Sequence, residues 1–326
     1  MVANKLKVAI VQAAPVFMNL VASLDLAVKL IGEAASKGAK LVVFGETWLP
    51  GYPAWLDYCP TAALWNHGPT KDVYAELRRN SLSLNSNETQ QLTKAVADHQ
   101  VVLVIGVNER VDSGPGNGTL YNSLLTFNSD GRLVNHHRKL VPTYTERLVW
   151  GQGDGRGLDA VDTSLGRVGG LICWEHWMPL ARQVLHNSGE QIHVAVWPTV
   201  HEMHQIASRH YAFEGRCFVL AAGLLMKVRD LPVQLPVAPD FSDKPDQLLL
   251  RGGSAIVGPD GSYVMEPVFD EERILMADLD LDLIDRERMT LDVSGHYHRP
   301  DLFDLRVKAT GSETSLDEFR SLPLSL

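Results

Sequence analysis

Short runs of Val, Ile and Leu recur along the chain, separated by amphipathic stretches, and this alternation restricts the fold more than any other feature. The runs predict buried strands at about 6–13, 40–45, 101–107, 120–127, 132–137, 167–172, 191–197, 217–223, 253–258, 262–266 and 273–279. Helical patterns fall at about 19–37, 70–80, 87–99, 177–188, 202–214 and 281–289. Strands that alternate with helices in the amino-terminal half predict an α/β architecture.

Two Asp-Gly pairs, at 130–131 and 260–261, each lie between strand-like runs. Glycine adopts positive φ without steric cost, so both pairs predict hairpins. Each hairpin would add antiparallel strands to a mixed sheet, with one hairpin in each of two sheets. The segment Leu231–Pro245 contains four prolines and scattered aspartates, which predict a long loop.

The composition is that of a globular protein and restricts its partners. The chain has 326 residues, of which 45% are hydrophobic and 21% charged, and a formal net charge of −9. Negative charge disfavours nucleic acid and anionic membrane surfaces, so we expect neither as a partner. No apolar stretch approaches the ~20 residues that span a bilayer. Three cysteines without paired spacing, and an amino terminus without a signal-peptide pattern, predict a location in the reducing cytoplasm.

Cys173 lies in the string Gly-Gly-Leu-Ile-Cys-Trp-Glu-His, where an apolar run ends at a thiol. The carboxyl ends of buried strands border the crevices of α/β sheets, so this position suits a nucleophile. A free cysteine is more commonly a small buried hydrophobe, and that is our interpretation of Cys59 and Cys217.

Two further strings supply ionisable groups. Glu46 follows the apolar run Val-Val-Phe-Gly, and Lys139 and Glu146 lie in His-His-Arg-Lys-Leu-Val-Pro-Thr-Tyr-Thr-Glu-Arg. Taken singly, each side chain could be an ordinary surface charge. An open α/β sheet could nevertheless bring these distant strings to one edge.

Together, the strings around Glu46, Lys139 and Cys173 resemble the Glu-Lys-Cys triad of the nitrilase, or carbon–nitrogen hydrolase, superfamily. Cys-Trp-Glu-His and Trp-Gly-Gln-Gly-Asp-Gly at 150–155 resemble the true nitrilase branch, and the likeness extends from about residue 6 to 303. The resemblance implies a four-layer α-β-β-α sandwich of two mixed sheets. We expect one domain over residues 1–307 and a tail over 308–326.

The resemblance also implies roles for four residues in a reaction without a cofactor or metal. Cys173 would attack the substrate carbon, Glu46 would act as the base, and Lys139 would stabilise the anionic tetrahedral intermediate. Glu146 is similar to the additional glutamate that holds the lysine in this family.

The expected activity is hydrolysis of an organic nitrile to the acid and ammonia, through a thioimidate and then a thioester. An amidase or N-carbamoyl hydrolase would use the same triad, although Trp174 after the cysteine favours a nitrilase. Hydrolysis of cyanide and a non-catalytic scaffold are further alternatives.

Aromatic residues near the motifs are candidates for the substrate pocket. Tyr52, Trp174 and Trp197 could line it, and packing in the core or at an interface is the alternative for each.

Two other patterns have an ordinary interpretation. His201 and His204 are three residues apart, not the four of a zinc-protease helix, so we interpret them as surface histidines. The glycine-rich segment 151–157 does not open a helix after a strand, so it predicts a loop shaped for close backbone approach and not a nucleotide site.

The resemblance finally implies a homo-oligomer, a dimer or larger and possibly a spiral. Tyr211, Phe213 and Phe218 lie in or beside the helix predicted at 202–214, and aromatic residues are enriched in interface cores. The polar tail from Lys308 carries spaced Leu and Phe residues that could bind a neighbouring subunit.

Overall fold

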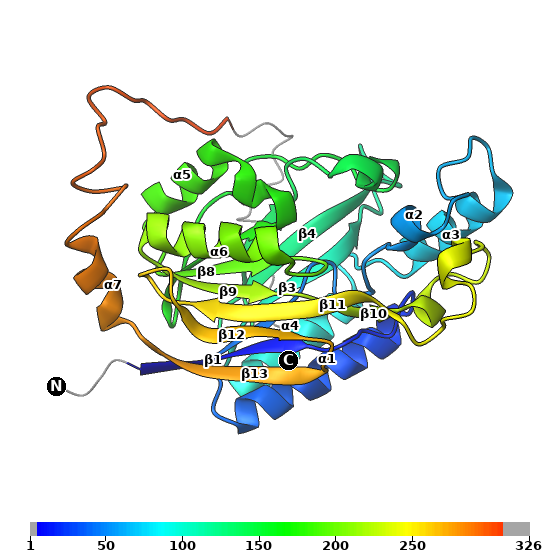
Figure 1. Cartoon of the computed structure of the whole chain (residues 1–326), viewed down its shortest axis with the longest axis horizontal. Coiled ribbons are helices and arrows are strands. Elements are labelled where there is room, and N and C mark those ends of the chain that lie inside the picture. Colours follow the sequence, from blue (N-terminus) through cyan, green and yellow to red (C-terminus); the bar gives the residue numbers. More distant parts are fainter. Residues whose placement is uncertain (1–4, 309–326) are drawn as a thin grey trace.

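The computed structural model of the chain describes residues 5–308. Over this range two mixed sheets lie between two layers of helices (Figure 1). The predicted α-β-β-α sandwich is therefore confirmed.

The first sheet has six strands in the order β13-β1-β2-β3-β4-β5. Their bounds are β1 (Lys5–Gln12), β2 (Leu41–Phe44), β3 (Val102–Arg110), β4 (Leu120–Phe127), β5 (Leu133–Arg138) and β13 (Arg273–Asp280). β1, β2 and β3 are parallel, and the outer strands pair antiparallel.

The second sheet has seven strands, with the order β10-β11-β9-β8-β7-β6 and β12 paired to β11. Their bounds are β6 (Val161–Thr163), β7 (Gly166–Ile172), β8 (Ile192–Val196), β9 (Phe218–Ala222), β10 (Leu225–Lys227), β11 (Leu248–Val257) and β12 (Tyr263–Phe269). β7, β8 and β9 are parallel, so their carboxyl ends meet at one edge of this sheet.

Helices cover the outer face of each sheet (Figure 1). α1 (Leu20–Ser36) and α4 (Asn87–His99) lie on the first sheet, and α5 (Pro179–Asn187) and α6 (Glu202–Gly215) on the second. The other helical segments are α2 (Trp55–Tyr58), α3 (Gly68–Arg79), α7 (Asp282–Arg288) and the 3-10 turns η1 (Tyr144–Leu148), η2 (Cys173–Trp177), η3 (Val228–Asp230) and η4 (Pro239–Phe241). Within residues 5–308, no helix is both long and apolar enough to cross a membrane.

The strands of the first sheet are buried on both faces. In β1, Val8 and Ile10 belong to the core between the two sheets, whereas Ala9 and Val11 belong to the core under the helices. A strand buried on both sides needs apolar residues at every position. This requirement explains the continuous Val, Ile and Leu runs of the sequence.

Both Asp-Gly hairpins form, and they lie in different sheets as predicted. β4 pairs with β5 in the first sheet, and β11 pairs with β12 in the second. The sequence missed the short elements β6, β10 and α2. It also placed the start of β11 too late, because Gly252 and Gly253 adopt positive φ and shift the register inside the strand.

The predicted interface aromatics occupy different environments. Tyr211 and Phe218 are completely buried within the subunit, so the expectation that they form an interface is wrong. Phe213 is 46% exposed on α6. The tail residues 309–326 lie outside the described residues.

Candidate functional site

Three strand ends from two sheets bring the predicted site residues together. Glu46 follows β2 and Lys139 follows β5 in the first sheet, whereas Cys173 follows β7 in the second. The Lys139 Nζ atom lies 3.0 Å from Glu46 Oε1. All three side chains are buried, with exposed fractions of 0% for Glu46, 1% for Lys139 and 5% for Cys173.

Glycines allow the backbone segments to approach this closely. A Cβ atom on Gly106 of β3 would lie 2.3 Å from the Gly45 oxygen, just before Glu46. A Cβ atom on Gly153 would lie 2.2 Å from the Arg138 oxygen, just before Lys139. Real Cβ atoms do not reach such distances, so only glycine fits at either position. The glycine-rich segment 151–157 therefore packs closely against the backbone next to Lys139, which is the close backbone approach that the sequence predicted.

Lys139 is shared by two carboxylates. Its Nζ atom lies 2.9 and 2.7 Å from the two oxygens of Glu146, in addition to its contact with Glu46. Glu146 also accepts hydrogen bonds from the Tyr52 hydroxyl at 2.9 Å and from the Thr143 N–H at 2.6 Å. Glu146 is thus held by several donors, and it fixes the position of the ammonium group.

Glu46 accepts fewer hydrogen bonds than Glu146. Its Oε1 atom accepts from Lys139 and from Asn122 Nδ2 at 2.7 Å, whereas its buried Oε2 atom has no hydrogen-bond partner among the described residues. Burial, opposed by Lys139 and reinforced by Glu146, raises the pKa of Glu46 to about 7. A carboxyl group with such a pKa and an unpaired oxygen can exchange protons near neutral pH.

Burial alone would lower the pKa of Lys139. The nearby negative charges of Glu46, Cys173 and Glu146 outweigh this effect and raise it well above the usual range. The ammonium group therefore remains a fixed positive charge in the site.

Cys173 is the first residue of the 3-10 turn η2, directly after β7. Its φ of 54° lies in the left-handed region, which costs about 1–3 kcal/mol for a residue with a side chain. Burial and the Glu46 carboxylate raise the pKa of the Cys173 thiol well above its usual range, although Lys139 opposes them. The resting group is therefore a thiol, and a base beside it would be needed to form the thiolate.

Glu175 ties the lysine segment to the cysteine turn. Its two oxygens accept from the Leu140 N–H and the Ile172 N–H, both at 2.7 Å, and from His137 Nε2 at 2.9 Å. Burial alone would raise the pKa of Glu175, but His137 and the two N–H groups lower it. The ionised carboxylate thus links residues that follow β5 and β7, strands of different sheets.

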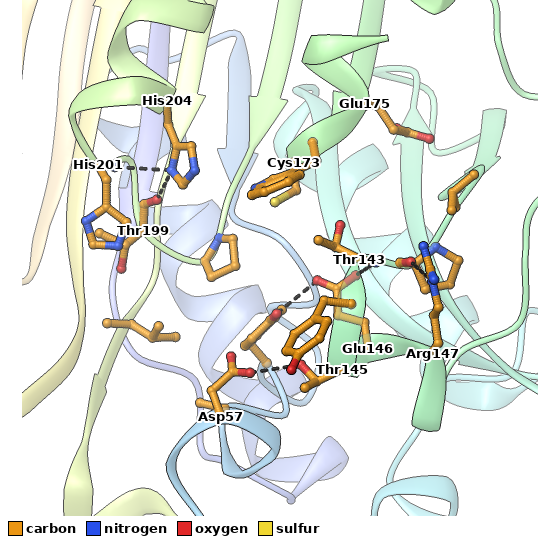
Figure 2. A pocket seen from close by; sticks show the side chains of 18 of the residues that line it. Asp57, Thr143, Thr145, Glu146, Arg147, Cys173, Glu175, Thr199, His201 and His204 are labelled. Atoms are coloured by element: carbon orange, nitrogen blue, oxygen red, sulfur yellow. Dashed lines mark hydrogen bonds between the residues drawn. The ribbon is translucent and has the colours of Figure 1, made fainter. Parts of the chain in front are cut away.

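Cys173 opens into a cavity of about 920 Å³, within the size range of small-molecule sites. Figure 2 shows His201 and His204 on one side of this pocket and Thr143, Glu146 and Arg147 on the other. Further lining residues are mostly apolar or aromatic and include Tyr52, Tyr58, Val141, Pro142, Tyr144, Trp174, Met178, Pro198, Leu249 and Leu250.

The predicted substrate-binding residues have three different placements. Tyr52 lines the pocket and bonds to Glu146, and Trp174 lines it with 55% of its surface exposed. Trp197 is completely buried and is not a lining residue, so the expectation that it forms the pocket wall is wrong. It stacks instead on His204 with ring centroids 4.4 Å apart.

His201 is exposed, as interpreted, whereas His204 is half-buried, and both also line the pocket, which the sequence did not predict. His204 Nδ1 lies 2.7 Å from the Thr199 oxygen, which holds the ring against the wall. Across residues 5–308 no group of three or more His, Cys, Asp or Glu side chains could hold a metal ion.

The sequence did not predict roles for Asn122, Thr143 or Glu175. Glu175 had a visible signal, because it lies two residues after Cys173 in the same string. Asn122 and Thr143 act through contacts with Glu46 and Glu146, which only the folded chain reveals.

Comparisons with known proteins identify one family. The model of the carbon–nitrogen hydrolase family matches residues 7–289. An aliphatic nitrilase of Sinorhizobium fredii (strain HH103) is 41% identical over 307 residues, which cover 93% of this chain and 96% of that protein. An arylacetonitrilase of Aspergillus niger is 37% identical over 319 residues, covering 93% of this chain and 89% of that protein.

Solved structures also share the fold. A carbon–nitrogen hydrolase of Helicobacter pylori G27 superposes with a TM-score of 0.70 at 20% sequence identity, covering 91% of this chain and 97% of the other. With a family match over most of its length and relatives well above 30% identity, the chain belongs to the carbon–nitrogen hydrolase family.

Proposed function

We propose that the chain is a nitrilase, which converts an organic nitrile and two waters into a carboxylic acid and ammonia. The observation that carries the proposal is the buried Lys139 ammonium held between Glu46 and Glu146 beside the Cys173 thiol. Relatives that cover nearly the whole chain are named aliphatic nitrilase and arylacetonitrilase, which favours nitriles over other carbon–nitrogen substrates.

In the first step, the Cys173 sulfur adds to the nitrile carbon while its proton passes to Glu46 and then to the nitrile nitrogen. The product is a thioimidate. Glu46 Oε2, which has no other partner among the described residues, is the oxygen suited to take the proton.

Water then adds to the thioimidate to give a tetrahedral intermediate, and Glu46 carries the two water protons to the nitrogen, which becomes the leaving group. Cleavage of the carbon–nitrogen bond releases ammonia and leaves a thioester, which a second water hydrolyses to the acid and the free thiol. Lys139 stabilises the negative charge of each tetrahedral intermediate. If the carbon–sulfur bond of the first intermediate breaks instead, an amide leaves.

The pocket favours a substrate with an apolar body. Aromatic and aliphatic side chains such as Tyr52, Trp174, Met178 and Leu249 form much of its wall. We expect aliphatic and arylaliphatic nitriles to fit such a wall.

An ammonia-release assay tests the proposal. The panel contains an aliphatic mononitrile, a dinitrile, an arylacetonitrile, the corresponding amides, an N-carbamoyl amino acid and cyanide, each with the wild-type chain and with Cys173→Ala. Release from organic nitriles by the wild-type chain alone supports a nitrilase. Release only from amides or the N-carbamoyl compound, only from cyanide, or from none would instead support the corresponding alternative.

We further infer that the enzyme is cytoplasmic and assembles into homo-oligomers. All three cysteines are buried and unpaired, which is compatible with a reducing compartment. Exposed apolar side chains on α6, including Phe213, support the assembly. We expect activity to survive chelators, which an assay in excess EDTA would check.

A further inference from the structure

A chain of buried histidines and glutamates leads from the Cys173 carbonyl toward the surface. His176 Nδ1 lies 2.7 Å from this carbonyl oxygen, and His176 Nε2 lies 3.0 Å from His193 Nε2. His193 Nδ1 lies 2.9 Å from Glu190 Oε2. These three side chains are 2%, 0% and 1% exposed, and none of them lines the pocket.

The chain continues through α5 and α6. Glu190 Oε1 lies 3.2 Å from His186 Nδ1, and His186 Nε2 lies 3.3 Å from Glu214 Oε2. The Tyr211 hydroxyl donates to Glu190, and Arg182 donates to Glu214 at 2.7 Å. Both carboxylates therefore have donors of their own.

The hydrogen bonds fix where the protons lie. A carbonyl oxygen only accepts, so His176 carries its proton on Nδ1. Burial and the neighbouring His193 lower the pKa of His176 well below its usual range, so this ring is neutral and its Nε2 atom is an acceptor. His193 Nε2 must then be the donor.

The other nitrogen of His193 faces a carboxylate. Burial alone would raise the pKa of Glu190, but His193 and His186 lower it to about 2, so Glu190 is ionised and only accepts. His193 is therefore held between the His176 ring on one side and a carboxylate on the other.

We propose that His176 is a positioning residue for the nucleophile, and that His193, held by Glu190, keeps the His176 ring in place to donate to the Cys173 carbonyl. The proposal rests on the proposed function, in which Cys173 is the nucleophile.

The backbone conformation at Cys173 explains why a hydrogen bond to its carbonyl is useful. Its backbone has a positive φ, a conformation that persists only where the surroundings hold it. The hydrogen bond from His176 restrains the peptide of the residue that carries the sulfur. Small shifts of a reacting atom lower the reaction rate strongly, because a misplacement of about 1 Å can reduce a rate about 100-fold.

Two substitutions of His176 separate the donor from the ring. In His176→Asn, the side-chain amide nitrogen takes the place of Nδ1 and keeps the hydrogen bond to Cys173. In His176→Leu, the donor is lost. We expect His176→Leu to lower kcat for nitrile hydrolysis roughly 10- to 100-fold with little change in KM, and His176→Asn to retain most of the wild-type kcat.

His67→Leu is the control, since His67 also makes a local hydrogen bond through Nδ1, to Thr70, but lies at the start of α3. It should leave kcat unchanged. Equal loss of kcat in the Asn and Leu variants of His176, or no loss in either, would overturn the positioning role.

The proton positions have a spectroscopic readout that does not depend on activity. In the ¹⁵N–¹H spectrum of histidine-labelled wild-type protein, His176 should carry its proton on Nδ1 and not on Nε2. The variant Glu190→Gln, which removes the carboxylate that holds His193, should weaken or shift this Nδ1 signal. A His176 ring protonated on Nε2 in the wild type would overturn the positioning role.

These outcomes remain distinct from failure of the proposed function. If the wild-type enzyme releases ammonia but the variants do not differ, only the inference about His176 is wrong. If the wild-type enzyme hydrolyses no nitrile, the proposed function fails, and the positioning role for a nucleophile is overturned with it.

Discussion

Glu46 and Glu146 share one buried cation, the ammonium group of Lys139. Two ionised carboxylates and one ammonium would leave a net negative charge in a buried site. Glu146 accepts hydrogen bonds from Tyr52 and Thr143 as well, whereas Glu46 has an oxygen without a partner among the described residues. The excess negative charge therefore acts mainly on Glu46, which is the group suited to gain and lose a proton.

This arrangement predicts the acid side of the pH profile. The pKa of Glu46 is raised to about 7, and only its ionised form can accept the thiol proton. As pH falls through 7 the carboxylate becomes protonated, so kcat/KM should fall and approach a tenfold loss per pH unit. Initial rates between pH 5 and 9 on a neutral nitrile check this, and a flat profile down to pH 5 would contradict it.

The variant Glu46→Gln should lower kcat by about 10²–10⁴-fold and abolish this acid limb, because the amide cannot accept the proton. Circular dichroism provides the control for folding. A variant with nearly wild-type activity would exclude Glu46 as the base.

Tyr52→Phe should shift the acid limb to higher pH. The Tyr52 hydroxyl partly neutralises Glu146, so its removal strengthens the repulsion between Glu146 and Glu46 and raises the pKa of Glu46 further. A hydrogen bond to a charged group contributes about 1.5–3 kcal/mol, so the free energy of unfolding should fall by a similar amount. Rate profiles and urea unfolding measure the two effects, and Tyr58→Phe, at a second tyrosine that lines the pocket, is the control.

Cys173→Ala should abolish nitrile hydrolysis and leave the fold intact. The change removes the nucleophile and little volume. Intact-mass analysis of the wild-type chain with a slow nitrile should detect an adduct, and peptide mapping should locate it at Cys173. Cys59→Ala and Cys217→Ala are matched controls at the other two buried thiols, and an adduct at either of those positions would refute the assignment.

Glu175→Gln should impair both stability and rate. The amide offers one oxygen, so its NH₂ group must face either the Leu140 N–H or the Ile172 N–H. A buried unsatisfied donor costs about 1–3 kcal/mol, and the lysine and cysteine segments lose their common support. Thermal unfolding and kcat test this together, and wild-type values for both would show that Glu175 does not link the segments.

The sequence predicted those parts of the fold that local patterns specify. Runs buried on both faces, such as Val8–Val11, have a clear apolar signature, and the Asp-Gly turns have a clear chemical one. The short strand β10 and the helix α2 lack both, because their positions depend on neighbouring segments.

The site was predictable to a similar extent. The strings around Glu46, Lys139 and Cys173 predicted it through their joint resemblance to a known triad. Glu46 and Cys173 each end an apolar strand, whereas Lys139 follows the polar end of β5. Trp197 and His204 were misjudged for one reason: they stack on each other, and the sequence does not show which ring faces the cavity. The spacing of residues in the sequence did not predict the chain of buried histidines and glutamates behind Cys173. This chain joins residues of four separate elements.

Assembly of the enzyme can be tested on α6, where Met203, Ile206 and Phe213 are 57%, 50% and 46% exposed. Such side chains on one helix expose apolar area that a second subunit could cover. We expect Phe213→Glu to lower the mass measured by light scattering, because the change places a charge in the contact, and Val21→Glu on α1 to leave it unchanged. A chain ending at Val307 tests the predicted role of the tail separately. A monodisperse wild-type species of 36.0 kDa would refute assembly. If both the Phe213→Glu variant and the truncated chain still form a large species, the contact between subunits lies elsewhere.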